Sequence, residues 1–339
     1  MGWRVIQWAT GNIGGRALRH IIEHPDYELA GLYSTGNAGR DAGKVAGLSP
    51  VGVTATASLE EIVATPADCV LYMRQGMDPG EVCAILASGK NIVTTRGEFH
   101  HPGSMDPALR TAVEEACAKG GTSIYSTGSS PGFVSEALAI PLLAQERRLD
   151  HMQIDEFADC SGRDSPDMIF NIMGFGQPPR EVDDNTTAHV KYGFAGTLSQ
   201  IGDAIGKPIE DFEVTGEFGY STRDIEIAAG TVRQGTMAAQ RIGIQCLSGG
   251  KAVLGFRANW YVSKEIDQDW DLRESGWRVQ VAGDVPLDVS ITFPIEPENY
   301  DAMTPGITAN RAVNAVPAVC AAAPGIRTTV DLPQVIPSL

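Results

Sequence analysis

The chain has 339 residues, enough for two domains, and 43% of them are hydrophobic, so each domain can bury a core of its own. Its 26 lysines and arginines stand against 42 aspartates and glutamates. The resulting net charge of −16 disfavours general binding to nucleic acid or to an anionic membrane surface.

The cysteines and the N-terminal stretch indicate the compartment. The six cysteines are scattered without a C-x-x-C pair, so we expect reduced thiols, no disulfide framework and no metal site. The opening residues GWRVIQWA lack the regions of a signal peptide, and no apolar run reaches the ~18 residues of a membrane span. We therefore expect a cytoplasmic protein with no membrane partner.

The first part of the chain alternates short β-rich runs with helical runs. We predict strands over residues 3–9, 27–34, 68–73, 91–95 and 122–127. We predict helices between them over residues 13–24, 58–65, 78–89 and 106–121. This alternation is typical of a doubly wound parallel sheet, an α/β Rossmann domain, which we assign to residues 1–146.

The alternation stops in the second part of the chain. We predict a helix over residues 134–146, a strand over 151–161, a helix over 186–206, mostly antiparallel strands over 210–295 and a helix over 307–326. Residues 147–306 therefore form an α+β domain with a mostly antiparallel sheet. The apolar composition of the last helix predicts that residues 307–339 return to pack on the first domain.

A glycine motif lies between the first predicted strand and the first predicted helix. It runs from Ala9 to Gly14, ATGNIG, which is the dinucleotide fingerprint G-x-G-x-x-G with alanine in the first place. Gly11 would let the backbone approach a pyrophosphate, and Gly14 would let the helix pack closely on the strand. We expect Thr10, Asn12 and Ile13 to complete this cofactor-binding turn. The alternative is a tight turn that needs small residues and binds nothing.

The end of the second predicted strand indicates which dinucleotide is bound. NAD-binding domains carry an acid there for the ribose 2′-hydroxyl, whereas this chain has Ser34, followed by Thr35, Asn37 and Arg40. Hydroxyl, amide and guanidinium groups suit a 2′-phosphate. We therefore expect NADP, with NAD as the tolerated alternative. The plain alternative for Arg40 is a solvated loop residue.

Catalytic groups are expected beyond the carboxyl ends of the fourth and fifth strands. Glu98 is the first acid after the fourth strand and can accept a proton or hold a cation there. Thr95, Gly128 and Pro131 are expected beside the cofactor ring. The plain alternative for Glu98 is a solvated loop glutamate. The pair His100 and His101 is expected at the rim or as caps rather than as general acids.

Five segments together resemble a known family: the glycine motif, TTRGEF, GSSPGF, HMQIDEFADCS and the closing ANRAVNAVPAVCAAAPGI. The chain resembles the 2,4-diaminopentanoate dehydrogenase and native amine dehydrogenase group, whose N-terminal domain is related to dihydrodipicolinate reductases. The resemblance covers essentially the whole chain. It implies hydride exchange between a nicotinamide cofactor and an amine or imine carbon, with Glu98 handling the amine proton. It also implies a homodimer joined largely through the second domain.

The reaction implied is the reversible oxidative deamination of an amine to a ketone or aldehyde plus ammonia. The expected substrate pocket is apolar and aromatic, although core packing is the plain alternative for each residue. It comprises Phe133, Met168, Phe170, Met173, Phe175, Tyr300, Met303 and Thr304. The sequence shows no obvious pair of arginines that could bind a substrate carboxylate. This favours a small neutral ketone or aldehyde and its amine as substrates.

Two other functions stay open at this point. One is an NADP-dependent carbonyl reductase or alcohol dehydrogenase in which Glu98 only orients the substrate. The other is a non-catalytic NADP-binding redox sensor that acts through a partner protein. Dependence of NADPH oxidation on ammonium separates the first of these from an amine dehydrogenase, and failure to oxidise NADPH with any carbonyl compound would favour the sensor.

Overall fold

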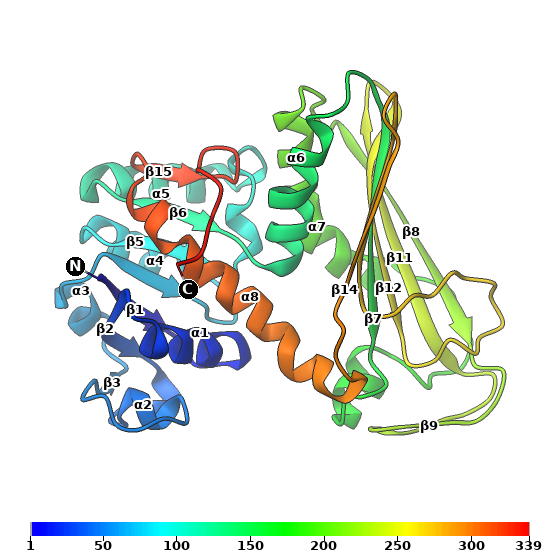
Figure 1. Ribbon diagram of the computed structural model, residues 1–339, viewed down its shortest axis with the longest axis horizontal. Helices are drawn as coiled ribbons and strands as arrows, with labels where there is room; N and C mark the ends of the chain where they lie inside the picture. Colours follow the sequence, from blue (N-terminus) through cyan, green and yellow to red (C-terminus); the bar gives the residue numbers. More distant parts are fainter. Residues whose placement is uncertain (1, 339) are drawn as a thin grey trace. The chain divides into compact units, whose positions relative to one another are not determined.

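The computed structural model describes residues 2–338, apart from the side chains of residues 297, 298 and 301. The chain forms two compact units (Figure 1). Unit 1 comprises Met1–Ala137 and Met303–Leu339, and unit 2 comprises Leu138–Ala302. The sequence predicts breaks after residues 146 and 306, whereas the units divide the chain after residues 137 and 302.

Unit 1 is built on a seven-stranded parallel sheet with the strand order β15-β6-β5-β4-β1-β2-β3. The strands are β1 (Trp3–Trp8), β2 (Tyr27–Tyr33), β3 (Ala55–Thr56), β4 (Cys69–Tyr72), β5 (Asn91–Thr94), β6 (Ser123–Ser126) and β15 (Gly325–Arg327). All five predicted strands are confirmed. β3 and β15 were not predicted because two or three residues are too few to show a period-2 pattern.

The predicted helices of unit 1 are confirmed as well. The helical elements are α1 (Asn12–Glu23), η1 (Thr35–Asn37), α2 (Ala42–Val45), α3 (Leu59–Ala64), α4 (Pro79–Ala87), η2 (Gly97–Phe99), η3 (Pro102–Ser104) and α5 (Pro107–Gly120). Asp78 and Asp106 cap α4 and α5, and each precedes a first-turn proline. Both faces of the sheet are covered: α4 and α5 contribute to one apolar core, α1 and α8 to the other.

Two irregular elements follow β6. η4 (Ser129–Leu138) is a π-helical segment whose first turn contains a kink, and α6 (Ala139–Leu143) continues it. The kink includes a cis peptide bond between Ser130 and Pro131, and Gly132 has φ +120°. The helix predicted over residues 134–146 is therefore present as the end of η4 and α6, and it ends at Leu143.

Unit 2 contains a six-stranded sheet with the order β14-β13-β7-β12-β11-β8, in which only the β7–β12 pair is parallel. Its strands are β7 (Leu149–Asp159), β8 (Asp211–Tyr220), β11 (Met237–Ser248), β12 (Lys251–Tyr261), β13 (Gly276–Gly283) and β14 (Leu287–Thr292), and β9 (Ile225–Ile227) with β10 (Gly230–Val232) forms a separate hairpin. α7 (Asp184–Ala204) packs on one face, where Phe194 stacks on Phe256 with ring centroids 3.6 Å apart. η5 (Asp167–Ile172) precedes α7.

The last helix differs from its predicted bounds. α8 (Pro297–Cys320) begins ten residues before the predicted start, and its residues from Met303 onward belong to unit 1. Ala312, Val313 and Val316 are fully buried there, which confirms the predicted return to the first domain. The predicted continuation to residue 326 is wrong, because the chain turns after Cys320 and Gly325 starts β15 beside β6. Among the described helices, none combines the length and the apolar character needed to cross a membrane.

Candidate active site

The glycine turn between β1 and α1 leaves room for a ligand at one position and none at another. Gly14 has no space for a side chain, because a Cβ would lie 2.3 Å from the carbonyl oxygen of Ala9. Gly11 has φ −67° and nothing within 4 Å of an added Cβ, so the fold itself does not require a glycine there. Gly11 also starts α1 without a side-chain cap. The turn thus presents free helix N–H groups beside open space, as a diphosphate requires.

Ala9 takes the place of the first glycine of the fingerprint. Its φ is +71°, the left-handed region that favours glycine. Ala9 is the sole non-glycine residue with positive φ among residues 2–338. Gln7 supports this conformation, because its Nε2 donates a hydrogen bond to the Ala9 carbonyl oxygen at 2.9 Å. The fingerprint geometry is therefore retained with an alanine under backbone strain.

Four polar side chains of unit 1 form one hydrogen-bonded chain beside the glycine turn. The Thr10 hydroxyl lies 2.8 Å from the Ser34 hydroxyl, and the Asn37 amide donates to Thr10 at 2.9 Å. Arg40 donates to the Asn37 Oδ1 at 2.6 Å and forms no ion pair with a described carboxylate. Thr35 is exposed in η1. The structure thus brings together the residues predicted to hold a 2′-phosphate, and it keeps one exposed guanidinium available for that group.

Glu98 lies in η2, directly after the carboxyl end of β5. Both of its carboxylate oxygens are bound by Arg96, at 2.6 Å from Nη2 to Oε1 and at 3.2 Å from Nε to Oε2. The side chains are 22% and 18% exposed. Such a two-point contact fixes the position of a carboxylate. The sequence analysis missed Arg96, although its position two residues before Glu98 was a signal for such a pair.

The start of this loop is held by neighbouring strands. The Thr94 hydroxyl donates to the Tyr72 carbonyl oxygen at 2.7 Å, and the Ser126 hydroxyl donates to the Arg96 carbonyl oxygen at 2.7 Å. Thr95 is half-buried between them. Phe99 is fully buried and fixes the other end of η2 in the core. Glu98 is thus presented by a rigid turn.

His100 is the C-cap of η2, as the prediction allowed, but it does not lie at a rim. It is only 3% exposed, and its Nδ1 lies 2.8 Å from Oε1 of the fully buried Glu136 in η4. The Thr329 hydroxyl donates to the other oxygen of Glu136 and lies 3.0 Å from the Tyr125 hydroxyl. A histidine can be buried when it finds such a partner, and Glu136 lies too far along the chain to be recognised from sequence. Burial, with Glu136 adding to it, raises the pKa of Tyr125.

The turn after β6 is tied to α8. Ser129 and Thr308 place their hydroxyl oxygens 2.8 Å apart. A Cβ on Gly128 would lie 3.0 Å from the carbonyl oxygen of Pro131, so both residues expected beside the cofactor belong to one tight bend. Phe133 is half-buried, with the guanidinium carbon of Arg311 6.0 Å from its ring centre. His101, the other histidine of the pair, stands at the N-cap of η3 and bonds Ser104 at 2.6 Å.

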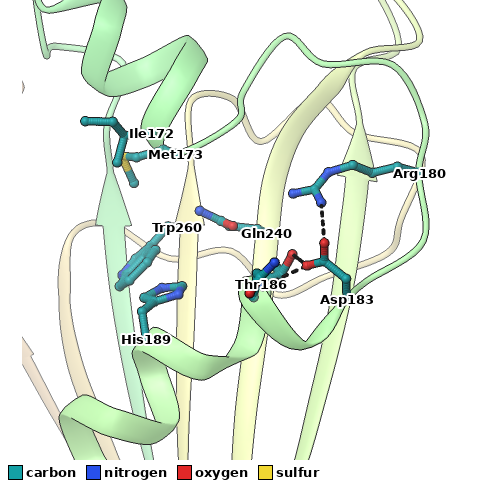
Figure 2. Close-up of a pocket in the computed structure, with 9 residues that line it drawn as sticks. Ile172, Met173, Arg180, Asp183, Thr186, His189, Gln240 and Trp260 are labelled. Carbon is teal, nitrogen blue, oxygen red and sulfur yellow. Dashed lines mark hydrogen bonds and ion pairs between the residues drawn. The ribbon is translucent and has the colours of Figure 1, made fainter.

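Unit 2 contains a cavity of about 450 Å³ between α7, η5 and the sheet (Figure 2). It is lined by Ile172, Met173, Arg180, Asp183, Asn185, Thr186, His189, Gln240 and Trp260. The Trp260 indole N–H donates to Glu156 at 3.1 Å, and the His189 ring lies 5.3 Å from the Trp260 ring. Partial burial lowers the pKa of His189, so its imidazole is neutral at pH 7. The size suits a small organic molecule.

The residues predicted for the substrate pocket divide between the two units. Met173 lines the cavity, with its sulfur 3.5 Å from Nη1 of Arg163. Phe175 is fully buried in the core of unit 2, and Phe170 packs against the same core. Met168 is 40% exposed.

Tyr300 is buried, and its burial raises the pKa of its hydroxyl to about 12. Met303 and Thr304 are half-buried in α8 and, like Phe133, belong to unit 1. The sequence analysis missed Gln240, His189 and Trp260, which lie on two strands and a helix with ordinary alternating patterns.

Comparisons with known proteins show which family and which fold the chain resembles. Residues 133–338 match the model of the 2,4-diaminopentanoate dehydrogenase C-terminal domain. The chain is 25% identical to an amine dehydrogenase from Streptomyces virginiae over 348 residues, covering 97% of this chain and 95% of that protein. It shares its fold with the solved amine dehydrogenase from Mycobacterium smegmatis, at a TM-score of 0.74 and 16% identity over 100% and 98% of the chains. A probable dehydrogenase from Thermotoga maritima also matches, at a TM-score of 0.55 and 12% identity over 97% and 92%.

Proposed function

Because the chain belongs to the 2,4-diaminopentanoate dehydrogenase family, as the match to the family's C-terminal domain shows, we propose that it is an NAD(P)-dependent amine dehydrogenase. The reaction is the reversible oxidative deamination of a small amine to a ketone or aldehyde plus ammonia. One observation carries the assignment within this chain: Glu98 follows the carboxyl end of β5 and is held by Arg96 at the edge of the sheet where such domains bind ligands.

The glycine turn and the polar cluster fit a nicotinamide dinucleotide. When bound, this cofactor supplies the acceptor and donor of hydride. The open space at Gly11 and the uncapped start of α1 would hold its diphosphate. Ser34, Asn37 and Arg40 would hold a 2′-phosphate, and this supports NADP as the preferred form.

Glu98 is proposed as the residue that handles the proton of the amine. In the oxidative direction its carboxylate takes a proton from the substrate ammonium, and the resulting free amine can release hydride from its carbon. Water then hydrolyses the remaining iminium to the ketone or aldehyde and ammonia. In the reductive direction the same carboxylate holds ammonia next to the carbonyl carbon. Arg96 holds the carboxylate in the same orientation for both steps.

Initial rates of NADPH oxidation test the proposal. We expect oxidation with cyclohexanone or a short aldehyde only when ammonium is present. Glu98→Gln and Glu98→Ala should lower kcat by about 10²- to 10⁴-fold and leave the Kd of NADPH unchanged. Glu114→Gln, at an exposed glutamate of α5 that also pairs with an arginine, is the matched control and should keep full activity.

Three results would contradict this function. Equal rates without ammonium would identify a carbonyl reductase instead. No oxidation with any carbonyl compound would favour an NADP-binding redox sensor. Unchanged kcat in both Glu98 variants would remove its assigned role.

The assembly and the compartment are also proposals. We propose a homodimer in the cytoplasm, acting on small molecules only. All six cysteines are free, which suits a reducing compartment. Light scattering on purified protein should give a mass of twice 36.0 kDa, and a mass of one chain would contradict the dimer.

A further inference from the structure

Unit 2 contains a second cavity, of about 400 Å³, where the ends of α6 and α7 meet the start of β7. We call it the helix-end cavity. It shares no lining residue with the cavity shown in Figure 2. All of its lining residues belong to unit 2, whereas Glu98 belongs to unit 1. Its volume falls in the range of ~300–1,000 Å³ that is usual for sites of small molecules.

Glu146 brings to this cavity a carboxylate with one unused oxygen. Its Oε2 accepts a hydrogen bond from the Val285 N–H at 3.2 Å, whereas Oε1 is buried and accepts none from a described residue. The backbone around it is fixed, because Asp284 accepts bonds from the N–H groups of Arg147 and Arg148 at 3.1 and 2.8 Å. The C-terminal end of α7, which also lines the cavity, adds partial negative charge. Because a buried carboxylate oxygen without a donor costs free energy, a cationic donor bound here would be stabilised.

The cavity also contains an ammonium group without a partner. Lys207 follows the end of α7 and is half-buried, and its side chain forms no ion pair or hydrogen bond with a described residue. The other basic residue of the lining, Arg147, is 80% exposed and pairs with Asp284 at 3.1 Å. Among the lining residues, Glu146 and Lys207 thus leave one negative and one positive group unpaired. A single ligand satisfies both groups only if it carries a charge of each sign.

The rest of the wall is mostly apolar. Four branched side chains from α6, from the end of α7 and from β7 form it, namely Ile140, Leu143, Leu149 and Ile205. Leu143 is only 7% exposed, and the other three are half-buried. Covering such side chains with a hydrocarbon group removes further apolar surface from water. The wall therefore fits a hydrocarbon body next to two opposite charges.

We propose that the helix-end cavity binds an apolar α-amino acid, such as leucine, in its zwitterionic form. The ammonium group of the ligand donates to Oε1 of Glu146, its carboxylate accepts a hydrogen bond from Lys207, and its hydrocarbon side chain lies against the apolar wall. A simple amine or a simple carboxylic acid would leave one of the two protein charges unpaired. The site belongs to a different unit from Glu98, so this inference goes beyond the proposed function and does not depend on it.

Calorimetric titration of the full chain with L-leucine tests the proposal, without cofactor so that no turnover occurs. Two competitors share the hydrocarbon body of leucine: 3-methylbutylamine lacks the carboxylate, and 4-methylpentanoate lacks the ammonium group. Both are measured by their ability to displace bound leucine. Leucine should bind about 10- to 100-fold more tightly than either, because each competitor loses one charge-assisted hydrogen bond.

Two substitutions each remove one of the protein charges. Glu146→Gln keeps an oxygen that can accept the Val285 N–H but loses the negative charge, and Lys207→Gln loses the positive charge. Each should weaken leucine binding about 10- to 100-fold. Glu146→Gln should also abolish the preference over 4-methylpentanoate while it keeps the preference over 3-methylbutylamine. Lys207→Gln should do the reverse.

Matched controls are Glu213→Gln on β8 and Lys251→Gln on β12, at exposed residues of unit 2 whose side chains bond no described residue. Both should bind leucine as the unaltered protein does. The inference is overturned if leucine does not bind, if Glu146→Gln and Lys207→Gln bind it as tightly as the unaltered protein, or if either of them keeps both preferences. If Glu146→Gln does not fold, Lys207→Gln decides alone. Turnover does not enter this test, so its outcome is independent of the amine dehydrogenase assignment.

Discussion

The polar side chains of unit 1 and those of the unit 2 cavity that Trp260 lines are satisfied in different ways. Near the glycine turn, Thr10, Ser34, Asn37 and Arg40 bond one another. In the cavity of unit 2, the Gln240 amide has no partner among the described residues. The first arrangement is closed by its own hydrogen bonds, whereas the Gln240 amide receives none from a described residue. The side chains beside the glycine turn thus hold one another in place.

This comparison leads to a general expectation about substitutions. Changes among the bonded side chains of unit 1 should alter stability and cofactor binding together, because those groups support one another. Changes at Gln240 should have little effect on stability, because its amide bonds no described residue. Four substitutions in unit 1 test how its hydrogen bonds and its glycine turn contribute to stability and to cofactor binding.

The largest effect is expected at Glu136. Glu136→Leu removes the carboxylate that the buried His100 and the half-buried Thr329 share, and it leaves both side chains without that partner. We expect the free energy of unfolding to fall by about 3 kcal/mol, measured by denaturant titration. The kcat should fall as well, because His100 follows the turn that carries Glu98. Glu136→Gln can still form hydrogen bonds to both neighbours, so it should lose much less stability. A Glu136→Leu variant as stable as the unaltered protein would contradict the role of this network.

Gly14→Ala should have the next largest effect. Its Cβ would meet the Ala9 carbonyl oxygen at 2.3 Å, so the turn must shift at a cost of about 2 kcal/mol, and NADPH should bind more weakly. Gly15→Ala is the control in the same helix, where the nearest atom would lie at 3.8 Å. This control should raise stability by up to about 1 kcal/mol. Thermal unfolding with and without NADPH measures the stability and the NADPH binding of each variant. Similar values for the two variants would show that the close approach of Gly14 to the Ala9 carbonyl oxygen is unimportant.

Arg40→Ala should change cofactor choice. We expect the Kd of NADPH to rise by about 10- to 100-fold, because a charge-assisted contact to the 2′-phosphate is lost. The Kd of NADH should stay nearly constant. Lys44→Ala, at a basic residue of the neighbouring α2, serves as the control for general charge effects. An equal loss of affinity for both cofactors would show that Arg40 maintains the structure of the loop instead of binding the 2′-phosphate.

The smallest effect is expected at Ala9. Ala9→Gly relieves the left-handed backbone at φ +71°, and after the entropy of glycine is subtracted we expect a gain of about 0.5 to 1 kcal/mol in stability. Ala17→Gly, within α1, should shift stability in the opposite direction by about 1 kcal/mol. A loss of stability in the Ala9 variant would show that the alanine side chain has a packing role of its own.

The two units also differ in how much of their structure could be predicted from the sequence. In unit 1 the strand–helix alternation, the glycine motif and the helix caps are all local patterns, and they gave the five predicted strands and the four helices between them within two residues. They did not give α2, β3, β15 or the end of α8. Arg96 was missed although it is two residues from Glu98. The partner of His100 was missed because Glu136 and Thr329 come from separate segments that meet only when the sheet and the C-terminal segment assemble.

In unit 2 the elements were predictable but the cavity was not. Gln240, Trp260 and His189 each fit an amphipathic strand or helix, so nothing in their spacing marks them as residues that line one cavity. The register of β11 against β12 pairs Gln240 with Trp260 on one rung. That register, and the packing of α7 over it, depend on contacts across many residues.

The sequence by itself determined the parallel sheet of unit 1, the dinucleotide-type turn and the position of Glu98 after β5, because each follows from the period and chemistry of a short stretch. Only the tertiary structure decided that Arg96 clamps both oxygens of Glu98, that His100 is buried on Glu136, and which side chains line the cavities of unit 2. The physical reason is that hydrogen bonds and burial depend on distance in space, which strand register and helix packing set, whereas a sequence pattern reports only distance along the chain.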